Sequence, residues 1–268
     1  METSQLLGYI LAVFVGMTLG MLGSGGSILS VPILVYVMGI EPTLATAYSL
    51  FVIGTTSLVG GIHKAKQKLV DFNKVVLFGI PAVISVFITR KIIVPTIPNI
   101  IFSTEYFTLT KSVLIMVVFA IVMIFASVRM IKPLKEKNFI DDEKLNYNKI
   151  ALLGICIGLI SGLVGAGGGF LIVPTLLIFA KTPMKMAVGT SLFIVAAQSL
   201  IGFTGDIMSD QIIDWKLLEY FTLASIIGIF IGNFISKKVA DEKLKTSFGW
   251  FVLSMGIYII IRELFLSQ

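Results

Sequence analysis

The chain has 268 residues, of which 56% are hydrophobic and only 13% are charged. About a quarter of the residues in a soluble domain are charged, so this composition predicts a polytopic membrane protein and excludes soluble enzymes, nucleic-acid-binding proteins and disulfide-rich secreted domains. The formal net charge is +6, but the basic residues lie in short loops between apolar stretches. There they indicate orientation in the membrane rather than a nucleic-acid partner.

The first apolar stretch, residues 7–40, is too long for one crossing of a bilayer core and too short for two crossings joined by a turn. Its middle, GMLGSGGS, is rich in glycine, which is a poor helix former, and Pro32 follows, as proline does in the first turns of a new helix. The stretch therefore predicts two half-helices that meet near the middle of the membrane. Full crossings are expected to follow at 44–62, 75–89 and 112–131.

A charged linker separates this first half from a second apolar half. Residues 149–180 again surround a glycine run, GLVGAGGG, and predict a second broken helix pair. Three more full crossings are expected at 186–205, 217–235 and 248–261. The predicted division is a first transmembrane repeat (1–131), a cytoplasmic linker (132–149) and a second transmembrane repeat (150–268).

The two halves repeat one another. A shift of 142 positions aligns GMTLGMLGSGGSILSVPIL (16–34) with GLISGLVGAGGGFLIVPTL (158–176) without a gap. Because a re-entrant pair returns to its own side, each repeat crosses the membrane three times, and an odd number of crossings inverts the second copy. The predicted fold class is an all-α polytopic membrane protein with two inverted-topology repeats, each a broken, re-entrant helix pair plus three transmembrane helices.

The positions of the basic residues predict the orientation. Most of the 21 Lys and Arg residues lie in four loops, at 63–74, 129–149, 181–185 and 236–246. Cytoplasmic loops carry an excess of these residues, so the four loops are assigned to the cytoplasm and both termini are expected outside it.

Inverted repeats with broken helices are typical of secondary transporters, in which the two interruptions meet near the membrane midplane. Each second half-helix begins just after its glycines, so its unpaired N–H groups and the positive end of its dipole are expected to face the centre and to favour an anion. Hydroxyl and amide side chains on the following spans complete the predicted substrate-binding set. Its members are Gly23, Ser24, Gly25, Gly26, Ser27, Ser49, Gly165, Ala166, Gly167, Gly168, Gly169, Thr190, Ser191, Gln198 and Ser199.

Packing offers an alternative interpretation of some of these residue types. The pairs Gly16/Gly20 and Gly158/Gly162 form GxxxG motifs, which usually indicate close helix packing. Serine and threonine in membrane helices commonly bond to a neighbouring helix or to their own backbone. The glycine runs themselves recur at matching positions before proline, which packing alone does not require. We expect leucine at Gly26 or at the matching Gly168 to block anion binding while the protein stays folded.

No ionisable residue is expected deep in any span. Arg90 and Lys91 are assigned to the membrane interface, while Asp71 and Asp214 precede crossings and are expected to cap helix N-termini. No metal ion or other cofactor is predicted, because no second His or Cys neighbours His63. A membrane-embedded enzyme is disfavoured, because the spans offer hydroxyls with no base beside them.

The doubled pattern GxxxGxxGxGGGxxxxP, the SLF that follows each copy (49–51 and 191–193) and the stretch GGIHKAK…VDF resemble the sulfite exporter TauE/SafE family of bacterial membrane proteins, also called the TSUP transporters. The resemblance spans nearly the whole chain. In one departure the first copy has Ser27 where the pattern has glycine. The resemblance implies movement of small sulfur-containing anions, such as sulfite or a sulfonate, across the bacterial inner (cytoplasmic) membrane.

The predicted function is a secondary transporter of a small anion that works by alternating access in the lipid bilayer. Export is favoured over import, because expelling one negative charge from a negative cytoplasm releases about 2.3 kcal/mol per 100 mV and because no buried acid or histidine is expected to relay protons. The alternative is an anion channel that uses the same paired half-helix N-termini.

Overall fold

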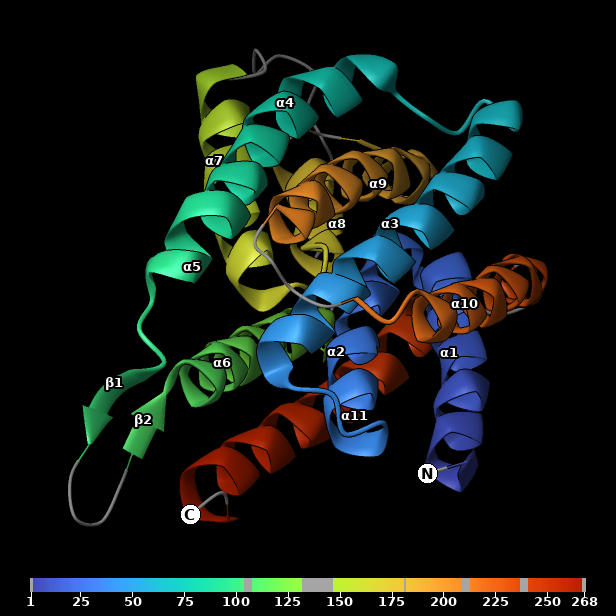
Figure 1. The fold of residues 1–268 in the computed structure, drawn as a ribbon. Coiled ribbons are helices and arrows are strands. Elements are labelled where there is room, and N and C mark those ends of the chain that lie inside the picture. Colours follow the sequence, from blue (N-terminus) through green and yellow to red (C-terminus); the bar gives the residue numbers. More distant parts are fainter. Residues whose placement is uncertain are drawn as a thin grey trace.

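The structure of the protein is a computed structural model that describes residues 2–103, 108–131, 147–180, 182–208, 213–236 and 241–266. Its longer helices, arranged as in Figure 1, are α1 (Glu2–Leu22), α3 (Pro42–Lys66), α4 (Phe72–Ile88), α6 (Lys111–Ile131), α7 (Tyr147–Val164), α8 (Gly169–Ile178), α9 (Met184–Ile207), α10 (Trp215–Ile235) and α11 (Asp241–Ile261). Shorter helical pieces are the 3₁₀ helix η1 (Gly23–Leu29), α2 (Ser30–Pro32), α5 (Val94–Thr96) and the π-helical turns η2 (Ile33–Val37), η3 (Thr89–Ile93) and η4 (Arg262–Leu266).

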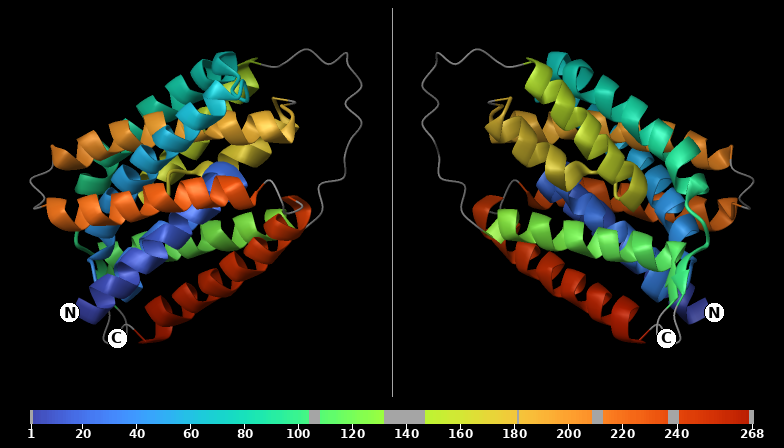
Figure 2. Two further views of the ribbon diagram at one scale, coloured as in Figure 1. Left: turned by 90° about the vertical axis from the view of Figure 1, so that its right-hand side faces the viewer. Right: turned by 90° about the vertical axis from the view of Figure 1, so that its left-hand side faces the viewer.

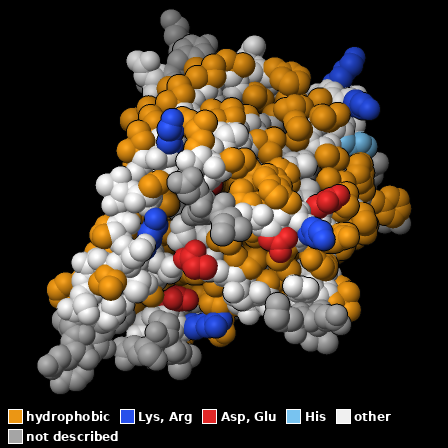
Figure 3. Space-filling model, in the orientation of Figure 1, with side chains coloured by type: hydrophobic (Ala, Val, Ile, Leu, Met, Phe, Trp, Pro, Cys, Tyr) orange, Lys and Arg blue, Asp and Glu red, His pale blue; other side chains and the backbone are white. Residues whose placement is uncertain are grey.

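The predicted all-α polytopic architecture is confirmed. Six helices in the described residues are long and apolar enough to cross a membrane: Gln5–Leu22, Pro42–Lys66, Phe72–Thr96, Lys111–Val128, Met184–Ile207 and Trp215–Ile235. Five of them match predicted crossings, whereas Gln5–Leu22 was predicted as one arm of a broken pair and the predicted crossing at 248–261 is not among the six. Large hydrophobic side chains point outward from them; Ile84, Phe125 and Ile227 are each more than half exposed. Figure 3 shows how much of one face is apolar. Lipid solvates such a surface, whereas water would drive it to associate.

A short β-hairpin was not predicted. Between α5 and α6 the chain forms two antiparallel strands, β1 (Ile100–Ser103) and β2 (Thr108–Thr110), which project from the helices in Figure 1. The segment is rich in β-branched and aromatic residues, a composition that favours strands. From the sequence, this segment was expected only to connect two spans.

The helices of the two halves pack against each other in matched pairs. α1 lies along α10, and its counterpart α7 lies along α4, the counterpart of α10. α3 packs against its own counterpart α9, and α6 packs against α11 along one side of the molecule (Figures 1 and 2). Exchanging the two halves therefore leaves this set of packing pairs unchanged.

The GxxxG glycines permit two of these close approaches. A Cβ on Gly16 would lie 1.8 Å from the carbonyl oxygen of Ser225, and a Cβ on Gly158 would lie 2.5 Å from the carbonyl oxygen of Ala82. Neither separation is possible for a real Cβ, so the α1–α10 and α4–α7 interfaces require glycine at these positions. The packing interpretation of these motifs is confirmed.

Asp71 and Asp214 cap helix N-termini, as predicted. The carboxylate of Asp71 accepts a hydrogen bond from the backbone N–H of Lys74 at 3.3 Å, at the start of α4. The carboxylate of Asp214 accepts one from the backbone N–H of Leu217 at 3.1 Å, at the start of α10. Each cap satisfies a backbone donor that the first turn of a helix leaves without a partner.

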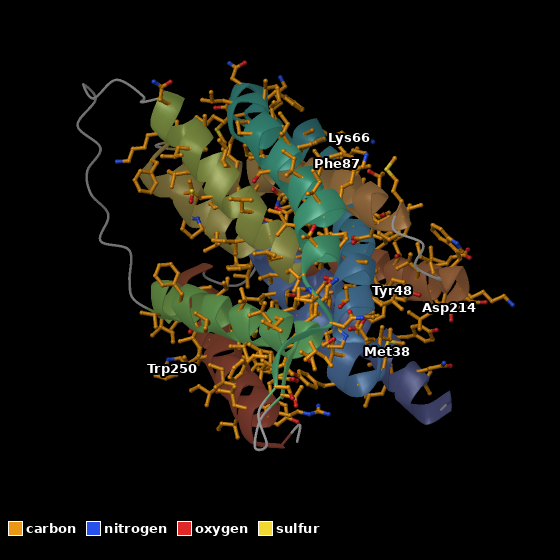
Figure 4. All side chains as sticks on the ribbon, turned by 60° about the vertical axis from the view of Figure 1, so that its left-hand side comes forward. Met38, Tyr48, Lys66, Phe87, Asp214 and Trp250 are labelled. Atoms are coloured by element: carbon orange, nitrogen blue, oxygen red, sulfur yellow. The ribbon has the colours of Figure 1, made fainter. Side chains whose placement is uncertain are left out.

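A hydroxyl from the opposite half binds the backbone of each capping residue. The N–H of Asp71 donates to Oγ1 of Thr190 on α9 at 3.0 Å. The N–H of Asp214 donates to the hydroxyl of Tyr48 on α3, and Figure 4 labels both residues. Positions 48 and 190 are separated by the repeat distance of 142, so these two hydrogen bonds are equivalent under exchange of the halves.

The helices begin and end at two opposite sides of the bundle. In Figure 2 the start of α1, the β-hairpin and the end of η4 lie at one end, while the end of α6 and the start of α7 lie at the other. The start of α1 and the end of η4 therefore lie on the side opposite the end of α6 and the start of α7.

Glu41 joins α3 to α6 outside the membrane-spanning segments. Its carboxylate accepts hydrogen bonds from the Ser112 hydroxyl at 2.5 Å, the Thr43 hydroxyl at 2.9 Å and the backbone N–H of Leu44 at 3.0 Å. Partial burial alone would raise the pKa of Glu41, but these hydrogen bonds outweigh it and hold the pKa below its usual value of 4.5.

The lowered pKa of Glu41 predicts a loss of stability in acid. A group whose pKa is lower in the folded state stabilises the protein fully above its unfolded pKa, and the stabilisation disappears as the pH falls through the folded pKa. We expect the unfolding midpoint of the detergent-solubilised protein to fall as the pH drops below about 4.5, and Glu41→Gln to make that fall shallower. Equal pH profiles for wild type and Glu41→Gln would contradict this role.

Candidate functional site

Both predicted helix interruptions are present. α1 ends at Leu22, and Gly23 follows with a φ angle of +67°. α7 ends before Gly165, Gly167 and Gly168, whose φ angles are +71°, +66° and +61°. Residues with a side chain rarely adopt this left-handed conformation, so glycine is what lets the chain leave the helix at both places.

The two broken pairs are less alike than predicted. The first arms, α1 and α7, have 21 and 18 residues, whereas the return arm α8 has only 10. In the first half the return arm is not a regular α-helix, because η1, α2 and η2 follow one another. The first cluster, Gly25 to Ser27, thus lies in a 3₁₀ helix, and only the second cluster, which ends at Gly169, opens an α-helix. In the first half the return helix, Gly26–Val37, therefore begins as a 3₁₀ helix, because the glycine-rich GSGGS disfavours a regular α-helix.

The two glycine clusters touch directly. The hydroxyl of Ser24 donates a hydrogen bond to the carbonyl oxygen of Gly169 at 3.1 Å, across 145 positions of sequence. A Cβ on Gly169 would lie 2.1 Å from the carbonyl oxygen of Ser24. The backbones of the two interruptions are therefore in contact, with no room for a side chain between them.

Reciprocal contacts flank this meeting point. A Cβ on Gly23 would lie 2.8 Å from Cγ1 of Val188 on α9, and a Cβ on Gly165 would lie 2.3 Å from Cβ of Thr46 on α3. Positions 23 and 165, and positions 46 and 188, are each 142 apart. Each cluster is thus seated against the central helix of the opposite half.

Several buried hydroxyl groups, in or after the glycine clusters along the chain, have no hydrogen-bond partner among the described residues. The oxygens of Ser27, Ser49 and Ser199 are fully buried and unpartnered within the described residues. The Ser199 oxygen lies 3.0 Å from the position of a Cβ on Gly167, so it belongs to the second cluster. The oxygens of Ser30, Thr56 and Ser57 are likewise buried without a partner. Unsatisfied polar groups in an apolar interior are costly, and a polar ligand would satisfy them.

Gln198, which was predicted to bind substrate, contacts the second cluster. Its side-chain N–H donates to the carbonyl oxygen of Gly167 and, at 3.4 Å, to the hydroxyl of Ser161. Its Oε1 atom has no partner in the described part of the chain. The amide therefore fixes the glycine turn and leaves one acceptor uncommitted. Ala166, between the glycines, is fully buried.

Thr190 and Ser191 were predicted to bind substrate, but their hydroxyls have structural partners. Thr190 accepts the backbone N–H of Asp71, and Ser191 donates to the carbonyl oxygen of Val188 in its own helix at 2.8 Å. Thr190 thus fastens the loop before α4. The alternative in which such hydroxyls bond to the backbone holds at these two positions.

Removing the Thr190 hydroxyl is expected to reduce stability without changing the response to an anion. Thr190→Val leaves the Asp71 N–H without its acceptor, which costs about 1 kcal/mol. Thr190→Ser keeps the hydroxyl and serves as the control. Thermal unfolding of the purified variants, with and without added anion, checks the prediction. Loss of an anion response in Thr190→Val alone would return this residue to the binding site.

The expectation for Gly26 needs correction. A Cβ on Gly26 would lie 2.4 Å from the carbonyl carbon of Thr18, within the backbone of α1. Leucine at Gly26 would therefore disrupt the packing of η1 on α1 and would not leave the protein folded. The φ angle of +61° at Gly168 adds conformational strain to any substitution there.

A buried ion pair joins the ends of two spans. Arg90, in η3, is only 1% exposed, and its Nη1 lies 3.4 Å from Oδ1 of Asp206 near the end of α9, which is 3% exposed. Nη1 also donates to the hydroxyl of Thr46 at 3.0 Å. Arg90 is buried against α9, because Gly205 lets α9 approach so closely that a Cβ there would lie 3.1 Å from Cβ of Arg90.

No role was predicted for Asp206. Its position at the end of the 186–205 crossing suggests an interfacial residue. One signal was available: Arg90 and Asp206 carry opposite charges at crossing ends that the Lys and Arg count places on the same side. Pairing is how charged groups are accommodated within a membrane protein.

Comparison with known proteins places the chain among membrane transporters. The family model described as "Sulfite exporter TauE/SafE" matches residues 8–259. A "Probable membrane transporter protein" of Xylella fastidiosa (strain 9a5c) is 27% identical over 255 residues, covering 93% of this chain and 92% of the relative. YunE of Bacillus subtilis and MJ0441 of Methanocaldococcus jannaschii, each with the same description, are 26% and 25% identical and cover 95% and 97% of this chain and 96% and 98% of their own. No solved structure matches the chain.

Proposed function

Since the chain belongs to the sulfite exporter TauE/SafE family and is a multi-pass membrane transporter rather than an enzyme, we propose that it carries a small sulfur-containing anion, such as sulfite or a sulfonate, across the bacterial inner membrane. One observation carries the proposal beyond the family. The two helix interruptions meet at one buried place, where several hydrogen-bonding groups have no partner in the described residues.

The chemistry of this place suits an anion. α8 begins at Gly169, so its first backbone N–H groups and the positive end of its dipole point toward the contact between the clusters. The hydroxyls of Ser27 and Ser199 add donors. Sulfite and sulfonates present three oxygen acceptors each and match a site rich in donors. Such donors replace water around an anion without a lysine exposed to lipid.

The reciprocal packing supports a two-fold relation between the repeats 1–131 and 150–268. The distribution of Lys and Arg supports the inverted arrangement, with the linker 132–149 in the cytoplasm and both termini outside. In inverted repeats the two halves can exchange conformations, and the exchange opens a central site first to one side and then to the other. Alternating access follows from this arrangement.

Burial of the site favours a transporter over an open channel. Ser27, Ser49, Ser199 and Gln198 are all fully buried. An open anion pore needs polar groups in contact with water along its length. Here a solute reaches the site only when helices move, as alternating access requires.

Only the membrane potential supports a preferred direction of transport. The absence of a buried acid was one argument for export, and the burial of Asp206 removes it. The electrical argument remains, because outward movement of a negative charge releases about 2.3 kcal/mol per 100 mV. We therefore propose export, with a membrane potential sufficient to drive it.

Flux measurements on reconstituted liposomes test the proposal. We expect the full-length protein to take up ³⁵S-labelled sulfite, and unlabelled sulfite inside the vesicles to accelerate uptake of the label from outside. Exchange of this kind is a property of a carrier, whereas a channel would show conductance without acceleration. Empty liposomes are the control. No flux of sulfite, sulfate, thiosulfate, a sulfonate or a carboxylate would refute the proposed function.

A further inference from the structure

The guanidinium group of Arg90 has one edge without hydrogen-bond partners among the described residues. Nη1 is committed to Thr46 and Asp206, as described above. Nε and Nη2 have no hydrogen-bond partner in the described residues, although the side chain is fully buried. A buried charged group with unused donors is unfavourable unless something binds them.

The two unused donors form one edge of the guanidinium group, and this edge can bind a ligand. Nε–H and Nη2–H lie on the same side of the planar guanidinium group and point in parallel, which is the geometry that binds two oxygens of one carboxylate or oxyanion. Because arginine has donors and no acceptor, a ligand on this edge has to supply oxygens or a negative charge.

This edge lies beside the second glycine cluster. A Cβ on Gly165 would lie 2.7 Å from Nη2, so glycine at this position leaves the edge uncovered. Thr46, which accepts a hydrogen bond from Nη1, also packs against Gly165. Arg90 is thus held at the turn where the second helix pair is interrupted.

Asp206 holds the guanidinium in place and leaves this edge without a partner among the described residues. Asp206 faces Nη1, the nitrogen away from the edge, and Lys111 at the start of α6 interacts electrostatically with both Arg90 and Asp206. An anion on Nε and Nη2 therefore does not need to displace Asp206. The carboxylate opposes the anion through charge repulsion alone.

We propose that Arg90 binds the transported anion through Nε and Nη2, with Thr46 and Asp206 positioning the guanidinium group through Nη1. The inference rests on the proposed function and narrows its substrate class. The substrate carries at least two oxygens on one atom, as sulfite, sulfonates, sulfate and carboxylates do, and a halide is a poor substitute.

Thermal-shift titrations of the purified full-length protein with sulfite, at constant ionic strength and with chloride as the comparison anion, test this proposal. Asp206→Asn keeps a hydrogen-bond acceptor and removes the repelling charge, so sulfite is expected to bind about tenfold more tightly. Arg90→Gln/Asp206→Asn removes both charges together and is expected to weaken sulfite binding on the order of 100-fold, as loss of two charge-assisted hydrogen bonds does. Arg90→Lys keeps the charge without the two-pronged edge and is expected to fall between them.

Lys91→Gln is the matched control, because Lys91 is the next residue, carries the same charge and is exposed. It is expected to keep the sulfite response of the wild type. A wild-type response to sulfite that persists unchanged in Arg90→Gln/Asp206→Asn would overturn the role of Arg90 and leave the proposed function standing. A wild type that responds to no oxyanion would overturn both proposals.

Discussion

Replacing Gly169 by alanine is expected to destabilise the protein by about 3 kcal/mol, at the upper end of what overpacking causes. The added Cβ would lie 2.1 Å from the carbonyl oxygen and 2.3 Å from Cβ of Ser24. Both atoms belong to Ser24, which is fully buried in η1, so neither the oxygen nor the backbone that carries it can move aside easily. The φ angle at Gly169 is not in the left-handed region, so the expected loss comes from the contact between the clusters and not from backbone strain.

Gly79→Ala is the control for Gly169→Ala. Gly79 is also buried in a helix, but a Cβ there meets nothing closer than Cγ1 of Ile194 at 3.9 Å. Alanine favours a helix over glycine by about 1 kcal/mol, so this variant is expected to be neutral or slightly more stable. Thermal unfolding in detergent compares the two. Equal stability of both variants would mean that the two interruptions do not touch as described.

Removing one partner of the Arg90–Asp206 ion pair is expected to have the second large effect on stability. Arg90→Met and Asp206→Leu each leave an uncompensated buried charge, and each is expected to destabilise the protein by about 3–5 kcal/mol. The double variant leaves no charge behind and is expected to recover most of that loss, because apolar residues often replace a buried ion pair at little cost.

A double-mutant cycle on unfolding free energies in detergent measures this coupling. An interaction energy of more than about 2 kcal/mol between the two sites is expected, against near-zero coupling for sites that do not touch. Lys91→Met, at the exposed neighbouring position, should leave stability almost unchanged. Strictly additive losses at Arg90 and Asp206 would show that the pair does not form in the folded protein.

The predictions that the structure confirms rest on local preferences. Long apolar runs fix five of the six predicted crossings, because a helix must reach across the bilayer wherever it packs. The glycine clusters fix the interruptions, because their φ angles suit glycine whatever surrounds them. Asp71 and Asp214 cap the turns that begin next to them. Each of these effects acts over a few residues and is therefore visible in the sequence.

The tertiary structure alone decided which distant groups meet. Thr190 and Gln198 lie eight residues apart on α9, yet one holds the loop before α4 and the other holds the second glycine turn. The position of Arg90 at the end of a crossing suggests an interfacial residue, but the close approach of α9 pairs it with Asp206 across 116 positions. Helix packing sets these partnerships, and the energy of a buried charge depends on its partner more than on its own segment. The sequence by itself thus determined the spans, the helix breaks and the capped helix starts, while the tertiary structure determined which polar groups remain available for a ligand.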